Sequence, residues 1–241
     1  MKHLATTGHD PEIWRLFRAI ASHDRAAVRR LLAEAPALAR QAAKVGATRE
    51  AAADCYFAEI GHYAYGGDTP LHLAAAAHDR EVVEDLVSKG ANVRARNRRG
   101  AEPLHYAADG SPDSPAWDPD EQFAVVRFLI EAGADPDADN KDGVTPLHRA
   151  VRTRCTGAVR ALLEGGADLR KRNKSGSTPL HLAVQYTGRG GSGSARSREE
   201  QAAIVRLLLT RGARWTDEDR AGKAVRDSAS AGWIRAMFEE R

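Results

Sequence analysis

A six-residue motif that returns at regular distances constrains this chain more than any other feature of its sequence. Thr-Pro-Leu-His-x-Ala occupies residues 69–74, 145–150 and 178–183, and a degenerate copy beginning with Glu-Pro occupies residues 102–107. Successive copies begin 33, 43 and 33 residues apart. A repeat of this length is typical of a solenoid, in which each repeat packs only on its neighbours. We therefore expect a stack of similar units and not one globular core.

A second pattern keeps phase with the first and predicts what each repeat folds into. Paired apolar residues, such as Val82-Val83 and Leu86-Val87, recur after each copy of the motif, and Gly-Ala follows them. The threonine can cap a first helix, whose first turn accepts proline because no N–H donor is needed there. The apolar pairs form the buried stripe of a second helix, and the glycine ends it. A polar turn, such as Asn97–Gly100, leads into the next repeat.

Together these motifs closely resemble the ankyrin repeat, and the resemblance covers nearly the whole chain. It implies an all-α solenoid of about six helix-turn-helix units with short finger turns and three inserts, in a single domain over residues 1–241. The expected order is an N-terminal cap unit at 10–39, an insert at 40–66, repeats at 67–99, 100–142, 143–175 and 176–221, and a C-terminal cap unit at 222–241. The terminal units lack the full motif, as suits units that seal the ends of a solenoid.

The first insert has two interpretations that the sequence leaves open. About 22 extra residues interrupt the repeat, and they include three of the five tyrosines, Tyr56, Tyr63 and Tyr65. The stretch from Thr48 to Ala53 has the composition of a short helix. The insert is then either an extra helix that packs on the N-terminal cap or an aromatic binding loop on a rigid scaffold.

The other two inserts carry weaker functional signals. Three prolines stiffen residues 110–120, and we expect Trp117 to pack against a neighbouring element, with exposure to a partner as the alternative. Residues 187–198 are rich in glycine and serine and formally contain G-x-G-x-x-G. That match is weak, because a dinucleotide fingerprint follows a strand and this one follows a helix. We interpret the segment as a flexible linker.

No arrangement of residues predicts a catalytic centre, a cofactor or a metal ion. The motif histidines lie in separate repeats, on the order of 8–10 Å apart, whereas zinc ligands lie about 2 Å from one centre. Cys55 and His62 are a nucleophile and a base, yet nothing in their spacing brings them together. We interpret Cys55 as a small buried residue, while the arginines around Cys155 are a setting that lowers the pKa of a thiol. The family resemblance implies a structural role, bonding backbone groups near the turn, for His72, His105, His148 and His181.

Charge and cysteine content limit the class of partner and the compartment. The formal net charge is only +3, and the basic fingers at 94–99 and 170–174 alternate with an acidic finger at 135–142. Nucleic acid is not the expected ligand, because a duplex needs a continuous positive track. The two cysteines are too few and too far apart for a disulfide framework, and residues 1–8 lack the apolar segment of a signal peptide. No apolar run is long enough for a membrane helix. These features predict a cytoplasmic protein, which we expect to be a monomer.

The resemblance further implies that the chain binds another protein on a concave face of finger turns and inner helices. In the family, contacts come from finger residues before the glycine and from exposed residues of the first helix, and tyrosine and arginine dominate interface energetics. The predicted contact residues are Tyr63, Tyr65, Arg98, Arg99, Lys141, Asp142 and Lys174 on the fingers, and His78, Tyr106, Arg152, Arg154, Gln185 and Tyr186 on the helices. The alternative is a small-molecule-binding or enzymatic protein whose residues 55–68 fold over the groove and form a pocket. An enclosed cavity there favours the alternative, and an open groove favours protein binding.

Overall fold

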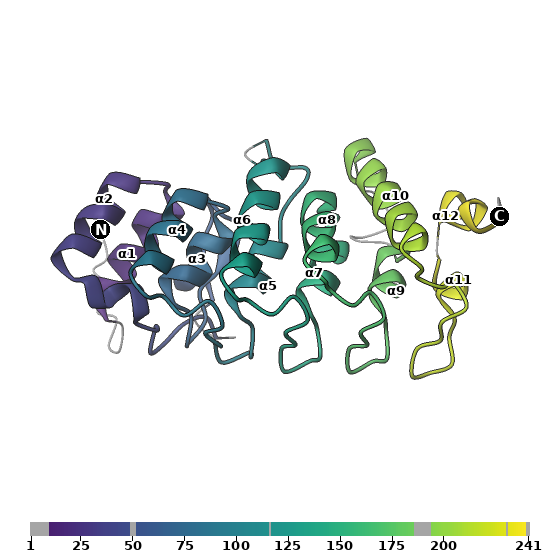
Figure 1. The fold of residues 1–241 in the computed structure, drawn as a ribbon, viewed down its shortest axis with the longest axis horizontal. Coiled ribbons are helices and arrows are strands. Elements are labelled where there is room, and N and C mark those ends of the chain that lie inside the picture. Colours follow the sequence, from purple (N-terminus) through teal and green to yellow (C-terminus); the bar gives the residue numbers. More distant parts are fainter. Residues whose placement is uncertain (1–9, 49–51, 116, 186–193, 230, 240–241) are drawn as a thin grey trace. The chain divides into compact units, whose positions relative to one another are not determined.

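The computed structural model describes residues 10–48, 52–115, 117–185, 194–229 and 231–239. Within these residues the chain consists mostly of short helices joined by turns, which confirms the predicted all-α repeat fold (Figure 1). The chain divides into two compact parts, an N-terminal part at Met1–Tyr106 and a C-terminal part at Ala107–Arg241.

The described residues of the N-terminal part form two helix pairs with the first insert between them. The pairs are α1 (Pro11–Ala21) with α2 (Arg25–Glu34), and α3 (Pro70–Ala76) with α4 (Arg80–Ser88). The region between them holds two 3-10 turns, η1 (Pro36–Arg40) and η2 (Ala53–Cys55), and an antiparallel hairpin of β1 (Tyr56–Phe57) and β2 (His62–Tyr63). The short α5 (Pro103–Ala108) begins in this part and ends in the next.

The C-terminal part continues the alternation of helices and turns. The second insert precedes α6 (Pro119–Glu131), and α7 (Pro146–Thr153) pairs with α8 (Thr156–Glu164). The next pair is α9 (Pro179–Ala183) and the longer α10 (Ala195–Thr210), and the last is α11 (Val225–Ser228) and α12 (Gly232–Glu239).

The start of α10 corrects the predicted boundaries of the glycine-serine linker. Residues 195–198 are helical, so the linker prediction is wrong for them, and residues 186–193 lie outside the described chain. Ser194 explains the start, because its hydroxyl accepts a hydrogen bond from the Ser197 N–H at 3.0 Å and caps the helix.

The repeated motif builds the same turn each time. At the start of α7, the Thr145 N–H donates to Nδ1 of His148 at 3.2 Å, and the Thr145 hydroxyl accepts from the His148 N–H. Nε2 of His148 then carries the ring proton and donates to the Ser177 carbonyl of the following repeat at 3.0 Å. His72 and His181 make the equivalent pair of bonds. The predicted structural role of these three histidines is confirmed.

Burial favours the neutral form of two of the motif histidines. It lowers the pKa of His148 and of His181, although each also gains a hydrogen bond to a backbone carbonyl, which acts in the opposite direction. His105, in the degenerate copy, accepts the Glu102 N–H at 3.1 Å. Among the described residues, no three side chains of the metal-binding types lie close enough together to hold a metal ion.

Candidate functional site

The first insert is anchored on the N-terminal helices by its backbone and by one aromatic side chain. The Ala43 N–H donates to the Asp68 carbonyl at 2.7 Å, which ties the start of the insert to its end. The hairpin turns Phe57 inward, where it is only 7% exposed and stacks on Trp14 with 6.0 Å between ring centroids. The described part of the insert is therefore an anchored hairpin. Of the short helix predicted from Thr48 to Ala53, residues 49–51 lie outside the described chain.

The opposite face of the hairpin presents tyrosines to solvent. Tyr56 and Tyr63 are paired across the two strands, are 44% and 37% exposed, and have ring centroids 4.7 Å apart. The Tyr65 ring follows at 6.4 Å from that of Tyr63. The guanidinium of Arg99 lies 4.7 Å from the Tyr65 ring centroid, and that of Arg98 lies 5.6 Å from it. We call these five residues the tyrosine–arginine patch.

Four members of the patch are among the predicted contact residues, and the structure brings these four together. Tyr56 is the member that the repeat pattern does not indicate, because it lies in the insert and has no equivalent in a regular repeat. Its exposure follows from strand alternation, which places Tyr56 outward when Phe57 points inward. Gly61, at φ +61°, lies in the turn between the two strands, but a single glycine is too weak a signal to predict a hairpin whose strands are two residues long.

A buried carboxylate fixes the two segments that carry the patch. Asp68 is fully buried and accepts hydrogen bonds from the Tyr65 N–H at 2.6 Å, the Asn97 side-chain amide at 2.8 Å and the Tyr106 hydroxyl at 2.9 Å. The Asn97 side-chain oxygen in turn accepts the Arg99 N–H at 2.9 Å. The network thus connects the insert at Tyr65 to the finger at Arg99. A patch held in this way loses little conformational entropy on binding.

Two predicted contact residues on the helices are wrong, because the structure buries them. Tyr106 is 1% exposed, with its hydroxyl in the Asp68 network and its ring stacked on His62 at 4.3 Å. Arg154 is 5% exposed and ends α7 in the left-handed conformation, at φ 64°. Burial lowers the pKa of Arg154, and the charge of Asp113 opposes that shift. Neither side chain is available to a partner.

The remaining predicted contacts are not members of the patch. Five of them are exposed in the C-terminal part: Lys141, Asp142, Arg152, Lys174 and Gln185. The Lys174 N–H donates to the Asp142 carbonyl at 3.0 Å, so these two fingertips are neighbours. His78 is only half-exposed, and Tyr186 lies outside the described chain.

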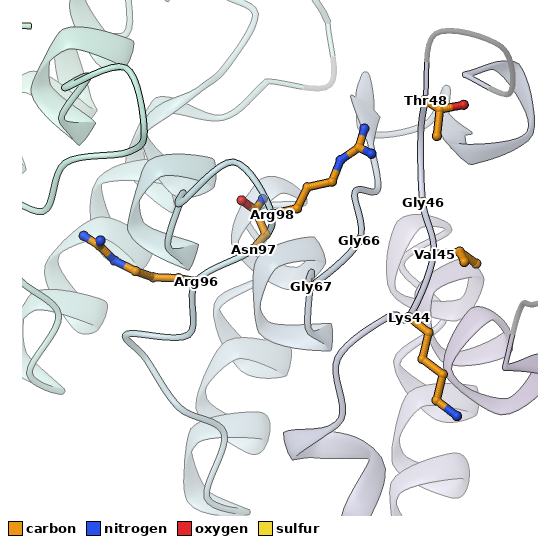
Figure 2. Close-up of a pocket in the computed structure, with 9 residues that line it drawn as sticks. All are labelled: Lys44, Val45, Gly46, Thr48, Gly66, Gly67, Arg96, Asn97 and Arg98. Carbon is orange, nitrogen blue, oxygen red and sulfur yellow. The ribbon is translucent and has the colours of Figure 1, made fainter. Parts of the chain in front are cut away.

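An open pocket of about 510 Å³ shares Arg98 with the patch. Figure 2 shows it between the extended segment 44–48 and the finger 96–98, with Gly66 and Gly67 between them. Of the predicted pocket-forming segment 55–68, only these two glycines line it. The hairpin therefore does not close over this pocket, and the geometry gives no support to the small-molecule alternative.

Neither cysteine has the surroundings of a nucleophile. Both thiols are free and buried. Burial raises the pKa of Cys55, and the charge of Asp54 raises it further. Burial also raises the pKa of Cys155 to about 12, which outweighs the hydrogen bonds that act in the opposite direction. The expected lowering of the Cys155 pKa is therefore wrong, and burial disfavours the reactive thiolate form of both cysteines.

Comparison with known proteins identifies the family. Residues 118–219 match the family model described as "Ankyrin repeats (3 copies)", and residues 66–98 match the one described as "Ankyrin repeat". Together the two matches cover more than half of the chain. The chain belongs to the ankyrin-repeat family. Ankyrin repeats are protein–protein interaction modules, and this chain is accordingly a protein-binding repeat protein.

A curated protein shows a local similarity to this ankyrin-repeat chain. The nuclear factor NF-kappa-B p105 subunit of Gallus gallus is 55% identical over 40 residues, which is 17% of this chain and 4% of that protein. The chain thus matches only a small fraction of that protein's length. Separately, none of the helices in the described ranges has both the length and the apolar character needed to cross a membrane.

Proposed function

We propose that this ankyrin-repeat chain holds its protein partner on the tyrosine–arginine patch of its N-terminal part. One observation carries the proposal: Tyr56 and Tyr63 are the most exposed aromatic rings of a hairpin whose other face is anchored in the core. Tyrosine and arginine are the residue types that contribute most to interface energetics. A tyrosine ring also offers a large contact area at a low cost in side-chain entropy.

The exposed residues of the C-terminal part are proposed as additional contacts of the same partner. Asp142 and Lys174 are adjacent fingertips of opposite charge, and Arg152 and Gln185 are exposed at or just beyond the ends of first helices. Charges of both signs suit selective recognition of a protein surface better than they suit a uniformly charged polyanion.

We further propose that the protein resides in a reducing compartment, such as the cytoplasm, and that it is a monomer. Two free buried thiols support the compartment, because unpaired cysteines are typical of proteins kept reduced. Light scattering during size-exclusion chromatography tests the monomer, and a mass twice that of the chain contradicts it.

Affinity capture tests the patch. Immobilised wild-type chain and a Tyr56→Ala/Tyr63→Ala variant are incubated with extract of the native cells, and bound proteins are quantified by mass spectrometry. The control is Trp233→Ala in α12, because Trp233 is 37% exposed and matches Tyr63 in that respect. We expect the double variant to lose a protein that the control retains, with both variants folded by circular dichroism. Equal recovery on all three chains contradicts the assignment of the patch.

A further inference from the structure

We propose that the pocket between residues 44–48 and 96–98 takes the carboxylate of an acidic segment in the protein partner. The inference rests on the proposed function, since it names the chemistry that the partner presents at the edge of the same patch.

The lining of the pocket is cationic and contains no carboxylate. Three of its nine residues are Lys44, Arg96 and Arg98, and the others are three glycines, Val45, Thr48 and Asn97. Val45 is 37% exposed, so the pocket also offers one apolar side chain to a ligand. A side chain with a negative charge beside an apolar residue matches this lining.

Two of the three cations have no carboxylate partner in the described chain. Arg96 is compensated, because its Nε lies 3.1 Å from the buried carboxylate of Glu102. Lys44 and Arg98 form no ion pair among the described residues. By contrast, Arg25 of α2 pairs with Asp79, the N-cap of α4, at 2.9 Å and with Glu81 of α4 at 2.6 Å. The uncompensated positive charge of the pocket is therefore carried by Lys44 and Arg98.

Arg98 is the cation that is positioned to hold a carboxylate. Figure 2 shows it reaching from the finger toward residues 46–48, whereas Arg96 points away from that segment. Its Nη2 donates to the Ala47 carbonyl, and its backbone N–H donates to the Gly66 carbonyl at 2.8 Å, so both ends of the residue are held. The remaining guanidinium donors have no acceptor in the described chain and can bond an incoming carboxylate. Lys44 lies on the opposite wall and adds longer-range attraction.

An acidic protein segment fits better than a nucleic acid. A phosphate backbone needs a row of uncompensated cations, and this pocket has two. The adjoining patch adds tyrosine rings that suit the apolar neighbours of an acidic residue. The occupant is therefore a short segment in which aspartate or glutamate stands beside apolar residues.

The test uses random 12-residue peptides displayed on phage and selected on the full chain. We expect the retained peptides to be enriched in aspartate and glutamate. A synthetic peptide from that pool, measured by fluorescence anisotropy, should bind Arg98→Gln about tenfold more weakly and Lys44→Gln about 2- to 5-fold more weakly than wild type. The loss should shrink in high salt because part of the attraction is long-range. The control is Lys89→Gln, which removes an exposed cation at the end of α4.

Gly66→Ala is a second variant for the case in which Arg98→Gln disturbs the insert, because Arg98 also bonds the Ala47 carbonyl. A methyl group at Gly66 meets the Lys44 carbonyl at 3.6 Å and Cδ of Arg98 at 3.7 Å, which are ordinary contacts, so it narrows the pocket without strain. We expect weaker peptide binding with unchanged unfolding by urea.

The outcomes separate this inference from the proposed function. Peptides without acidic residues that bind through Tyr63 and ignore Lys44 and Arg98 overturn the pocket and leave the tyrosines of the patch as the contact. Acidic peptides that need Lys44 and Arg98 but bind Tyr63→Ala normally support the pocket and contradict the role of the tyrosines. Displacement of the peptide by poly(U) RNA that itself needs Arg98 assigns the pocket to nucleic acid and overturns the inference. A selection that enriches no peptide also overturns it.

Discussion

The first and second inserts both interrupt a repeat and both carry aromatic side chains, yet they use them in opposite ways. In the first insert, Tyr56 and Tyr63 are 44% and 37% exposed. In the second, Trp117 is 8% exposed and its Nε1–H donates to the Gln122 side-chain oxygen at 2.9 Å. The guanidinium of Arg196 lies 5.0 Å from the Trp117 ring centroid. The second insert therefore packs Trp117 into the core of the C-terminal part, whereas the first presents two tyrosines to solvent.

The difference shows that aromatic content alone does not identify a binding loop. Gln122 is fully buried, and its amide donates to the Ala107 and Asp109 carbonyls at 3.0 and 3.1 Å while it accepts from Trp117. A buried polar partner thus exists for the indole N–H, which makes burial of the tryptophan favourable. The expectation that Trp117 packs against a neighbouring element is confirmed. An exposed aromatic ring on an anchored backbone is the better sign of a binding surface.

The largest effect is expected from Trp117→Ala. Removing this side chain leaves a cavity beside α6 and takes the indole donor away from the Gln122 side-chain oxygen, and we expect the free energy of unfolding to fall by about 3 kcal/mol. Urea denaturation followed by circular dichroism measures it. Trp233→Ala is the matched control, since that tryptophan is 37% exposed and should cost less than about 1 kcal/mol. If both variants lost the same free energy of unfolding, Trp117 would not be a core residue, and the contrast between the two inserts would not hold.

The stability of the N-terminal part, which carries the first insert, should depend on pH through Asp79 at the start of α4. Burial alone would raise the pKa of Asp79, but hydrogen bonds from His23, Arg25 and the Val82 N–H, with the charge of Arg25, lower it to about 2. Because this folded-state pKa lies below the usual value of 3.8, the stabilisation is present above pH 4 and is lost as the pH falls through 2. The Asp79 side chain is only 1% exposed, and the shift corresponds to about 2 kcal/mol.

Asp79→Asn should therefore destabilise the chain by about 2 kcal/mol at pH 7 and by much less at pH 2, measured by urea unfolding at both values. Glu84→Gln serves as the control, because it removes an exposed pair with Arg80 and should cost less than about 0.5 kcal/mol. If the difference in the free energy of unfolding between wild type and Asp79→Asn were the same at both pH values, the charge of the carboxylate would not be the source of the stabilisation.

A smaller effect is expected where the second insert meets α10. The Ser194 hydroxyl donates to the Asp113 carboxylate and accepts the Ser197 N–H, so it caps the helix and holds the insert at once. Hydrogen bonds from Ser194 and Ser197 lower the pKa of Asp113. Ser194→Ala should cost about 1 kcal/mol and bring the Asp113 pKa back toward its usual value, as read by a carboxyl NMR titration. The control is Ser88→Ala in α4, whose hydroxyl bonds only the Asp85 carbonyl. An unchanged Asp113 titration contradicts this contact.

Local signals explain what could be predicted from the sequence, and distant contacts explain what could not. The Thr-Pro-Leu-His motif predicted the helix starts, because capping acts within one turn, and the family resemblance implied the structural roles of His72, His148 and His181. Tyr106 looked like an exposed position of a first helix. Its burial depends on Asp68, which lies 38 residues earlier and accepts a hydrogen bond from its hydroxyl.

The hairpin of the first insert was beyond sequence patterns for the same reason. Its strands are two residues long, too short for a recognisable alternation, and its orientation is set by contact of Phe57 with Trp14 and Phe17 of α1. Once Phe57 is placed inward, the outward position of Tyr56 and Tyr63 follows from the pleat. Four of the five patch residues could therefore be predicted, but Tyr56 and the outward side of the hairpin could not.

The smallest change in stability is expected for Tyr63→Ala. This variant tests most directly whether the tyrosines of the first insert differ from the buried Trp117 of the second. Tyr63→Ala removes a half-exposed ring and one cross-strand contact with Tyr56, so we expect a loss of about 0.5 kcal/mol in urea unfolding. Recovery of the captured partner should fall strongly in the same variant, because an interface aromatic is worth far more in the complex than on the free surface. Tyr63→Phe retains the ring and should retain most of the partner. A loss of stability at Tyr63 as large as that at Trp117 would mean that the tyrosines belong to the core, and neither the patch nor its contrast with the second insert would then stand.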